Sequence, residues 1–268
     1  SDLVYIASAN LSSRSNAIVA LRLTDDPTNP VGKPAGSVAW QFTGSANSPL
    51  DRVIGVPFID YALNRLYVTS LAGPNGTQSS LWVFSTIDGS VVANFALGPV
   101  SSSVGSGFTF DTLAPETLYV ANDTGQLYAL SVDPLALKWT GAANLGSPVV
   151  SFVWQDFNTP ERLYFTTKDG FIWALDDPGS GAPPSPSIPA WKTPLSGASG
   201  PLLFDTVLYV GGGDGKVHQI RLVDGVDEAQ VSVASPGEAL SDPAYSNSLD
   251  KILIGTAAGR VVAISIPF

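Results

Sequence analysis

The sequence predicts an all-β protein of about six repeated units, most of them made of four antiparallel strands. Three observations support this prediction. A short apolar strand with a central aromatic residue recurs along the chain, a tight turn ending in Gly follows most copies, and a second apolar strand comes next. The later copies lie about 45 residues apart, which is the length of a four-stranded blade. Since no segment keeps a helical period, the repeats indicate a β-propeller.

The first recurring strand places an aromatic or aliphatic residue between apolar neighbours. Its six copies occupy residues 3–6, 66–68, 118–120, 163–165, 208–210 and 252–254. The second recurring strand is also apolar, and its copies occupy residues 17–21, 80–84, 126–130, 171–175, 216–220 and 260–264. In four units the turn between them ends in Gly125, Gly170, Gly215 or Gly259. Gly tolerates the positive φ of hairpin turns, so these turns need no ligand to explain them.

Two further strand types complete the predicted units. A third strand carries Trp40, Trp139 or Trp191 in three of the units. A fourth segment, of small residues and Pro before an apolar stretch, opens a unit at 146–150, 199–203 and 241–244. Small residues suit the crowded inner strand of a blade.

The predicted units form one domain that spans residues 1–268. Their approximate bounds are 1–46, 47–98, 99–145, 146–196, 197–236 and 237–268. The first unit lacks an inner strand and the last lacks an outer strand, so the first and last blades are incomplete in this chain. Either two thinner blades close the ring, or further sequence or a neighbouring chain completes it.

These repeats resemble the PQQ-like, or quinoprotein-type, family of β-propellers. The best match runs from 147–149 through 163–165 and 169–176 to Trp191. Family members that are quinoprotein dehydrogenases rely on a calcium-binding set of acids and amides and often on a vicinal Cys pair. This chain has no Cys and no matching set. The resemblance therefore implies a non-catalytic propeller without a cofactor; it disfavours pyrroloquinoline quinone (PQQ) and leaves calcium open.

Composition excludes some partners. The chain has 23 acidic and 13 basic residues and a formal net charge of −10, so it would repel nucleic acid. No apolar run approaches the ~20 residues of a spanning helix, so we expect no membrane span. The first residues do not form a signal peptide, and without an initiator Met we expect a processed or trimmed chain.

Few residues suggest chemistry, and none is assigned a catalytic role or a metal. His218 is the single histidine, and it occupies a repeat position that other units fill with apolar or aromatic residues, which favours packing. The acidic pairs at 25–26 and 176–177 could bind calcium, but each precedes Pro in a turn, which favours solvated loop carboxylates. A pair of carboxylates for glycoside hydrolysis in the channel stays open, although no particular pair stands out.

Long loops mark the candidate binding surface. Loops 8–16, 43–51 and 71–79 belong to one face of a propeller, and loops on a rigid scaffold often carry recognition. The candidate contacts on these loops are Asn10, Arg14, Asn47, Asp51, Arg52 and Asn75. Tolerated insertions are the alternative explanation. Three sequons make Asn10, Asn75 and Asn122 the candidate glycosylation sites.

The sequence thus favours a non-enzymatic, secreted or cell-surface propeller that is a protein- or glycan-binding or structural assembly module. Its expected partners are another protein or copies of itself, with a glycan as a further candidate. Two alternatives stay open. One is an enzyme that uses the central channel, either a quinoprotein-like oxidoreductase or a carbohydrate-active enzyme. The other is a periplasmic or intracellular assembly scaffold.

Overall fold

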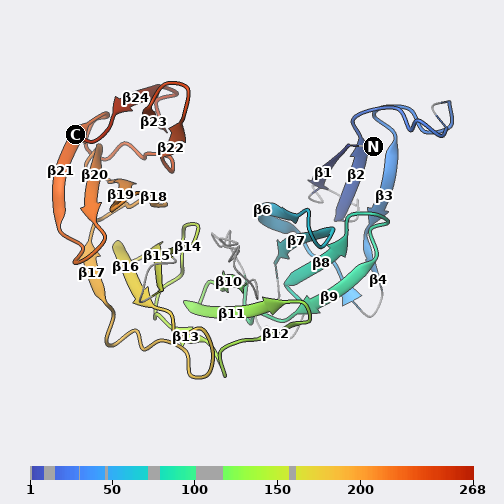
Figure 1. Cartoon of the computed structure of the whole chain (residues 1–268), viewed down its shortest axis with the longest axis horizontal. Helices are drawn as coiled ribbons and strands as arrows, with labels where there is room; N and C mark the ends of the chain where they lie inside the picture. Colours follow the sequence, from blue (N-terminus) through green and yellow to red (C-terminus); the bar gives the residue numbers. More distant parts are fainter. Residues whose placement is uncertain are drawn as a thin grey trace. The chain divides into compact units, whose positions relative to one another are not determined.

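The computed structural model confirms the all-β prediction. It describes residues 2–8, 16–29, 31–45, 48–71, 79–100, 117–156 and 161–268, and these residues form 24 strands and no helix. The chain divides into two compact units, Ser1–Ser103 and Val104–Phe268. The antiparallel sheets of both units appear in chain order in Figure 1. That all sheets form a single domain stays a prediction.

The first unit contains two blades and a short hairpin, and within each of these sheets every strand pairs antiparallel with the next in the chain. Blade 1 is the sheet β1(Leu3–Ser8), β2(Ala17–Arg22) and β3(Val38–Phe42). The hairpin is β4(Gly44–Ser45) and β5(Ser48–Pro49). Blade 2 is the sheet β6(Val53–Asp60), β7(Arg65–Ser70), β8(Leu81–Ser85) and β9(Val91–Phe95).

The second unit contains four blades. Blade 3 is the sheet β10(Thr117–Ala121), β11(Gln126–Val132), β12(Leu135–Leu137) and β13(Ala143–Asn144). Blade 4 is the sheet β14(Trp154–Asp156), β15(Arg162–Thr167), β16(Phe171–Asp176) and β17(Trp191–Pro194). Blade 5 is the sheet β18(Leu202–Phe204), β19(Val207–Gly211), β20(Lys216–Arg221) and β21(Asp227–Ser232). Blade 6 is the sheet β22(Ala244–Ser246), β23(Lys251–Gly255) and β24(Val261–Ser265).

The six predicted blades are therefore present, and the first and last have three strands, as predicted. Blade 3 differs in detail, because its outer strand is split: β12 and β13 both pair with β11, and Trp139 lies between them. The inner strand expected for blade 3 falls before β10, at 101–116, which lie outside the described residues.

The inner strands start at or after the predicted Pro-containing segments. β18 starts inside segment 199–203 and β22 at the last residue of segment 241–244, whereas β14 starts beyond segment 146–150. Before β14, only an isolated bridge joins Val149 to Thr167, and before β22 another joins Leu240 to Thr256. Pro has no N–H for the ladder, so Pro148, in the segment ahead of β14, cannot donate to it.

Blades 4 and 5 each use one face to cover the next blade. In the second unit, Tyr164, Ile172 and Ala174 of blade 4 pack on Leu208 and Val210 of blade 5. Alternate residues of blade 5 then cover blade 6, since Tyr209 and Val217 pack against Ile252, Ile254 and Ile264. The alternation follows from the strand period of two, and it explains why the recurring strands are apolar on both faces.

The third-strand Trp side chains fix the blades to their successors. Trp191 Nε1 donates to the Leu222 carbonyl at 2.7 Å, and Trp40 Nε1 donates to the Thr86 carbonyl at 3.0 Å. Three residues after each acceptor, a Gly lies against the indole ring: Gly89 against Trp40 and Gly225 against Trp191. A Cβ on Gly225 would come within 2.6 Å of the Trp191 ring. Gly225 also has a φ of +72°, which favours glycine. Both the contact with Trp191 and the backbone conformation therefore require Gly at this position.

Candidate functional site

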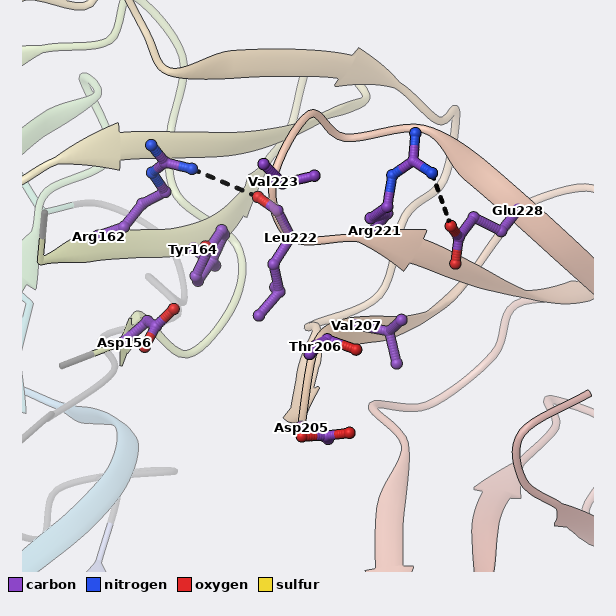
Figure 2. Close-up of a pocket in the computed structure, with 10 residues that line it drawn as sticks. All are labelled: Asp156, Arg162, Tyr164, Asp205, Thr206, Val207, Arg221, Leu222, Val223 and Glu228. Atoms are coloured by element: carbon purple, nitrogen blue, oxygen red, sulfur yellow. Dashed lines mark hydrogen bonds and ion pairs between the residues drawn. The ribbon is translucent and has the colours of Figure 1, made fainter. Parts of the chain in front are cut away.

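A cavity of about 490 Å³ lies between blades 4 and 5, within the second unit (Figure 2). We call it the inter-blade cavity. Blade 4 contributes side chains from β14 and β15, and blade 5 contributes the β18–β19 turn, the end of β20 and the start of β21. The lining residues are Asp156, Arg162, Tyr164, Asp205, Thr206, Val207, Arg221, Leu222, Val223 and Glu228.

Tyr164 is the most buried part of this lining, with 1% of the side chain's surface exposed. Its ring packs against Trp191, with the ring centroids 5.7 Å apart. The pKa of Tyr164 is raised to about 12, mainly by burial; the Arg162 guanidinium lowers the pKa and the nearby Asp156 carboxylate raises it. The hydroxyl therefore keeps its proton at neutral pH.

Both arginines of the cavity are already bonded to the protein. Arg162 donates from Nε to Asp176 Oδ1 at 2.7 Å and from Nη1 to the Leu222 carbonyl at 3.4 Å. Arg221 binds the two carboxylate oxygens of Asp224 at 2.9 and 2.6 Å, and its Nη1 donates to Glu228 at 3.1 Å. Figure 2 shows the Arg162–Leu222 contact, which joins blade 4 to blade 5, and the Arg221–Glu228 contact within blade 5. Both guanidinium groups are thus already paired with carboxylates of the protein.

Asp205 differs from these paired groups. Its side chain is exposed in the β18–β19 turn, and within the part of the chain that the structure describes it makes no hydrogen bond or ion pair. Its φ of +54° is left-handed, as are those of Asn64 and Asp250 in the corresponding turns of blades 2 and 6. Asp and Asn both tolerate this conformation. The turn therefore explains why one of these two residues stands at position 205, but it does not explain why that residue is the charged one.

The corresponding positions between other blades are built differently. Between blades 1 and 2, a cavity of about 580 Å³ is lined by Tyr5, Asn64 and Thr86 among others, and by no arginine or lysine. Between blades 3 and 4, Asp177 lies at the position of Leu222, where it accepts from Trp139 Nε1 at 3.1 Å and from the Tyr119 hydroxyl. A charged, open cavity is therefore a feature of the junction between blades 4 and 5.

The binding residues predicted from sequence lie mostly outside the described residues. This holds for Asn10, Arg14, Asn47 and Asn75. Asp51 and Arg52 are exposed neighbours just before β6, and the Arg52 amide donates to Asp51 Oδ1 at 2.6 Å. Their binding role stays a prediction.

Of the predicted glycosylation sites, only Asn122 is described. Its side chain is fully buried, and Oδ1 accepts from the Thr124 amide at 3.1 Å and the Gln126 amide at 3.0 Å. Its Nδ2 donates to Gln126 Oε1 at 2.7 Å. A glycan on this nitrogen would disrupt the turn in the folded chain.

His218 is buried, as the packing interpretation requires, but its surroundings are polar. Nδ1 lies 2.8 Å from Asp227 Oδ2, and Nε2 lies 3.1 Å from Asp214 Oδ1. Burial opposes ionisation of Asp214, yet its hydrogen bonds with His218 and the Lys216 amide lower the pKa of this carboxyl. Sequence analysis missed this cluster, although an acid four residues before the histidine is a signal for it.

One of the two acidic pairs, at 176–177, needs correction. Asp177 is not a solvated loop carboxylate, because two buried aromatic side chains donate to it. Asp176 pairs with Arg162, while Asp26 accepts from the Thr28 hydroxyl and amide, which lower the pKa of Asp26. Among the described residues, no three His, Asp or Glu side chains are placed to hold a metal ion.

Comparisons with known proteins agree with this fold. The family model described as outer membrane protein assembly factor BamB matches residues 31–267. The crystal structure of BamB from Moraxella catarrhalis is similar, with a TM-score of 0.66 and 17% identity; the match covers 98% of this chain and 69% of that one. The computationally designed Ika8 protein is similar at a TM-score of 0.58 and 12% identity, over 98% of this chain and 70% of that one. No curated protein matches the sequence.

Among the described residues, the structure contains no helix that could cross a membrane.

Proposed function

The chain belongs to the family of the outer membrane protein assembly factor BamB, and we propose that it is a non-catalytic assembly module that holds protein partners in the periplasm. The family match supports the assembly scaffold, one of the two alternatives left open by the sequence, better than the secreted or cell-surface module that the sequence favours. Glycan binding and self-association stay predictions.

Preorganised charges in the inter-blade cavity carry the proposal. Arg221 is held by Asp224 and Glu228, and Arg162 is held by Asp176, so neither cation must be ordered when a partner binds. Fixed groups reduce the entropic cost of association. The Tyr164 hydroxyl keeps its proton at neutral pH, so it is suited to hydrogen bonding rather than to acting as a base.

The proposal includes no cofactor. A propeller that positions partners needs a rigid scaffold and a recognition surface, and the packed blade interfaces provide the first. That the chain works without PQQ or calcium stays part of the proposal.

Native mass spectrometry of the full chain, tagged and purified gently from its source cells, tests this function. We expect a defined complex with an envelope protein, and the separately purified partner should bind the chain saturably in solution. The proposal would be contradicted if no fraction contained a partner bound to the chain and the chain oxidised an alcohol or aldose after PQQ and calcium were added. That result would favour the enzyme alternative.

A further inference from the structure

We propose that the inter-blade cavity binds a basic residue of a protein partner, a guanidinium or ammonium group on an apolar stem. This inference rests on the proposed function, because it specifies how the assembly module recognises a partner. The cavity lies between two rigid blades and has both buried and exposed lining.

Charge in and around the cavity favours a cation. Asp156, Asp205 and Glu228 line it, whereas its two cations, Arg162 and Arg221, are paired with further carboxylates. These partners, Asp176 and Asp224, bring the local total to five carboxylates against two guanidinium groups. The whole chain also carries a net charge of −10, which steers a basic partner toward it.

One carboxylate in the cavity is unpaired. The Asp205 carboxylate has no hydrogen bond or ion pair within the described ranges, and its position on the rim leaves it open to a ligand. The buried Tyr164 hydroxyl already has Arg162 as a polar neighbour. A basic residue of a peptide offers Asp205 the cation that it lacks.

The cavity walls suit the stem of such a residue. Val207 and Leu222 provide apolar surface inside, and Val223 is 70% exposed at the rim. Methylene groups of Lys or Arg pack on surfaces of this kind while the charged end reaches a polar partner. An acidic ligand would instead meet the lining carboxylates and two arginines that are already paired with carboxylates.

Asp205→Asn is the most informative variant. It removes one negative charge, and the left-handed turn should persist because Asn64 adopts the same φ of 54° in the corresponding turn of blade 2. Asp250→Asn is the matched control, because Asp250 has a φ of 51° in the corresponding turn of blade 6 and lies outside the lining of the cavity.

Methyl NMR titration of the full chain tests the proposal. The probes are acetyl-Gly-Arg-Gly-amide, its Lys equivalent, its neutral citrulline equivalent and its Glu equivalent. We expect saturable shifts at Val207, Leu222 and Val223 with the Arg and Lys peptides, and about tenfold weaker binding of the citrulline peptide. Asp205→Asn should weaken the Arg peptide about fivefold, while Asp250→Asn should leave it unchanged.

Three results would overturn the proposal: no saturable shift with either basic peptide, equal binding of the Arg and citrulline peptides, or unchanged binding in Asp205→Asn. Failure of this inference is distinguishable from failure of the proposed function. A native complex that persists while the basic peptides fail leaves the assembly function standing. A chain without any protein partner removes the assembly function and this inference with it, whatever the peptides do.

Discussion

Replacement of Asp177 by Ala should strongly destabilise the junction between blades 3 and 4. The carboxylate accepts from Trp139 Nε1 at 3.1 Å and from the Tyr119 hydroxyl, and both aromatic side chains are fully buried. A buried donor left without an acceptor costs about 1–3 kcal/mol. Two such donors give a loss of about 4 kcal/mol in the free energy of unfolding, a large share of the total for a typical domain.

Urea unfolding followed by tryptophan fluorescence measures this loss, because Trp139 lies in the affected junction. Asp176→Ala is the matched control: it removes the neighbouring carboxylate, whose ion pair with Arg162 is partly exposed, and should cost less than about 1 kcal/mol. Adding Tyr119→Phe to Asp177→Ala removes one orphaned donor and should restore about 1–2 kcal/mol. Equal destabilisation by Asp177→Ala and Asp176→Ala would refute the reasoning.

Three further predictions concern the second unit. Gly225→Ala should lower the free energy of unfolding by about 3 kcal/mol, measured by thermal or urea unfolding, because the new Cβ would meet the Trp191 ring at 2.6 Å and the φ of Gly225 is positive. Gly237→Ala is the control: Gly237 also has a positive φ but faces open space, so the cost should be about 1 kcal/mol. The pKa of Tyr164 is raised from 10.0 to about 12, so its contribution to stability is complete below pH 10, and about 2 kcal/mol of it should be lost by pH 12. Ultraviolet titration against Tyr164→Phe checks this, and an unchanged curve contradicts it. His218→Leu should cost about 2–4 kcal/mol in urea unfolding by leaving two carboxylates without their shared partner, and a neutral effect would favour simple packing.

The repeats predicted the blades well because strand pairing within a blade is local. An apolar strand, a Gly turn and a second apolar strand form a hairpin wherever they occur, and β15, β16 and Gly170 follow that pattern. The predicted segments contain the start of β18 and of β22, each directly after a Pro, whereas β14 starts later than predicted.

The contacts between blades could not be predicted in the same way. Tyr119 and Asp177 are 58 residues apart, and no local pattern relates them. The repeat does contain a signal that this junction is unusual. Asp177 is charged, whereas the equivalent positions in blades 5 and 2 hold Leu222 and Thr86. The inter-blade cavity depends on which of these side chains fills the junction, so it required coordinates.

Site-specific photocrosslinking from the rim of the inter-blade cavity tests the central claim most directly. Val223, which is 70% exposed, is replaced by a benzophenone amino acid in the full chain, and Ile188, which is 82% exposed and outside the cavity lining, provides the control position. We predict an adduct from position 223 to one envelope protein, at a peptide that carries Arg or Lys beside the crosslink, and none to that peptide from position 188. No protein adduct from position 223, or one at a peptide without a basic residue, would contradict the claim.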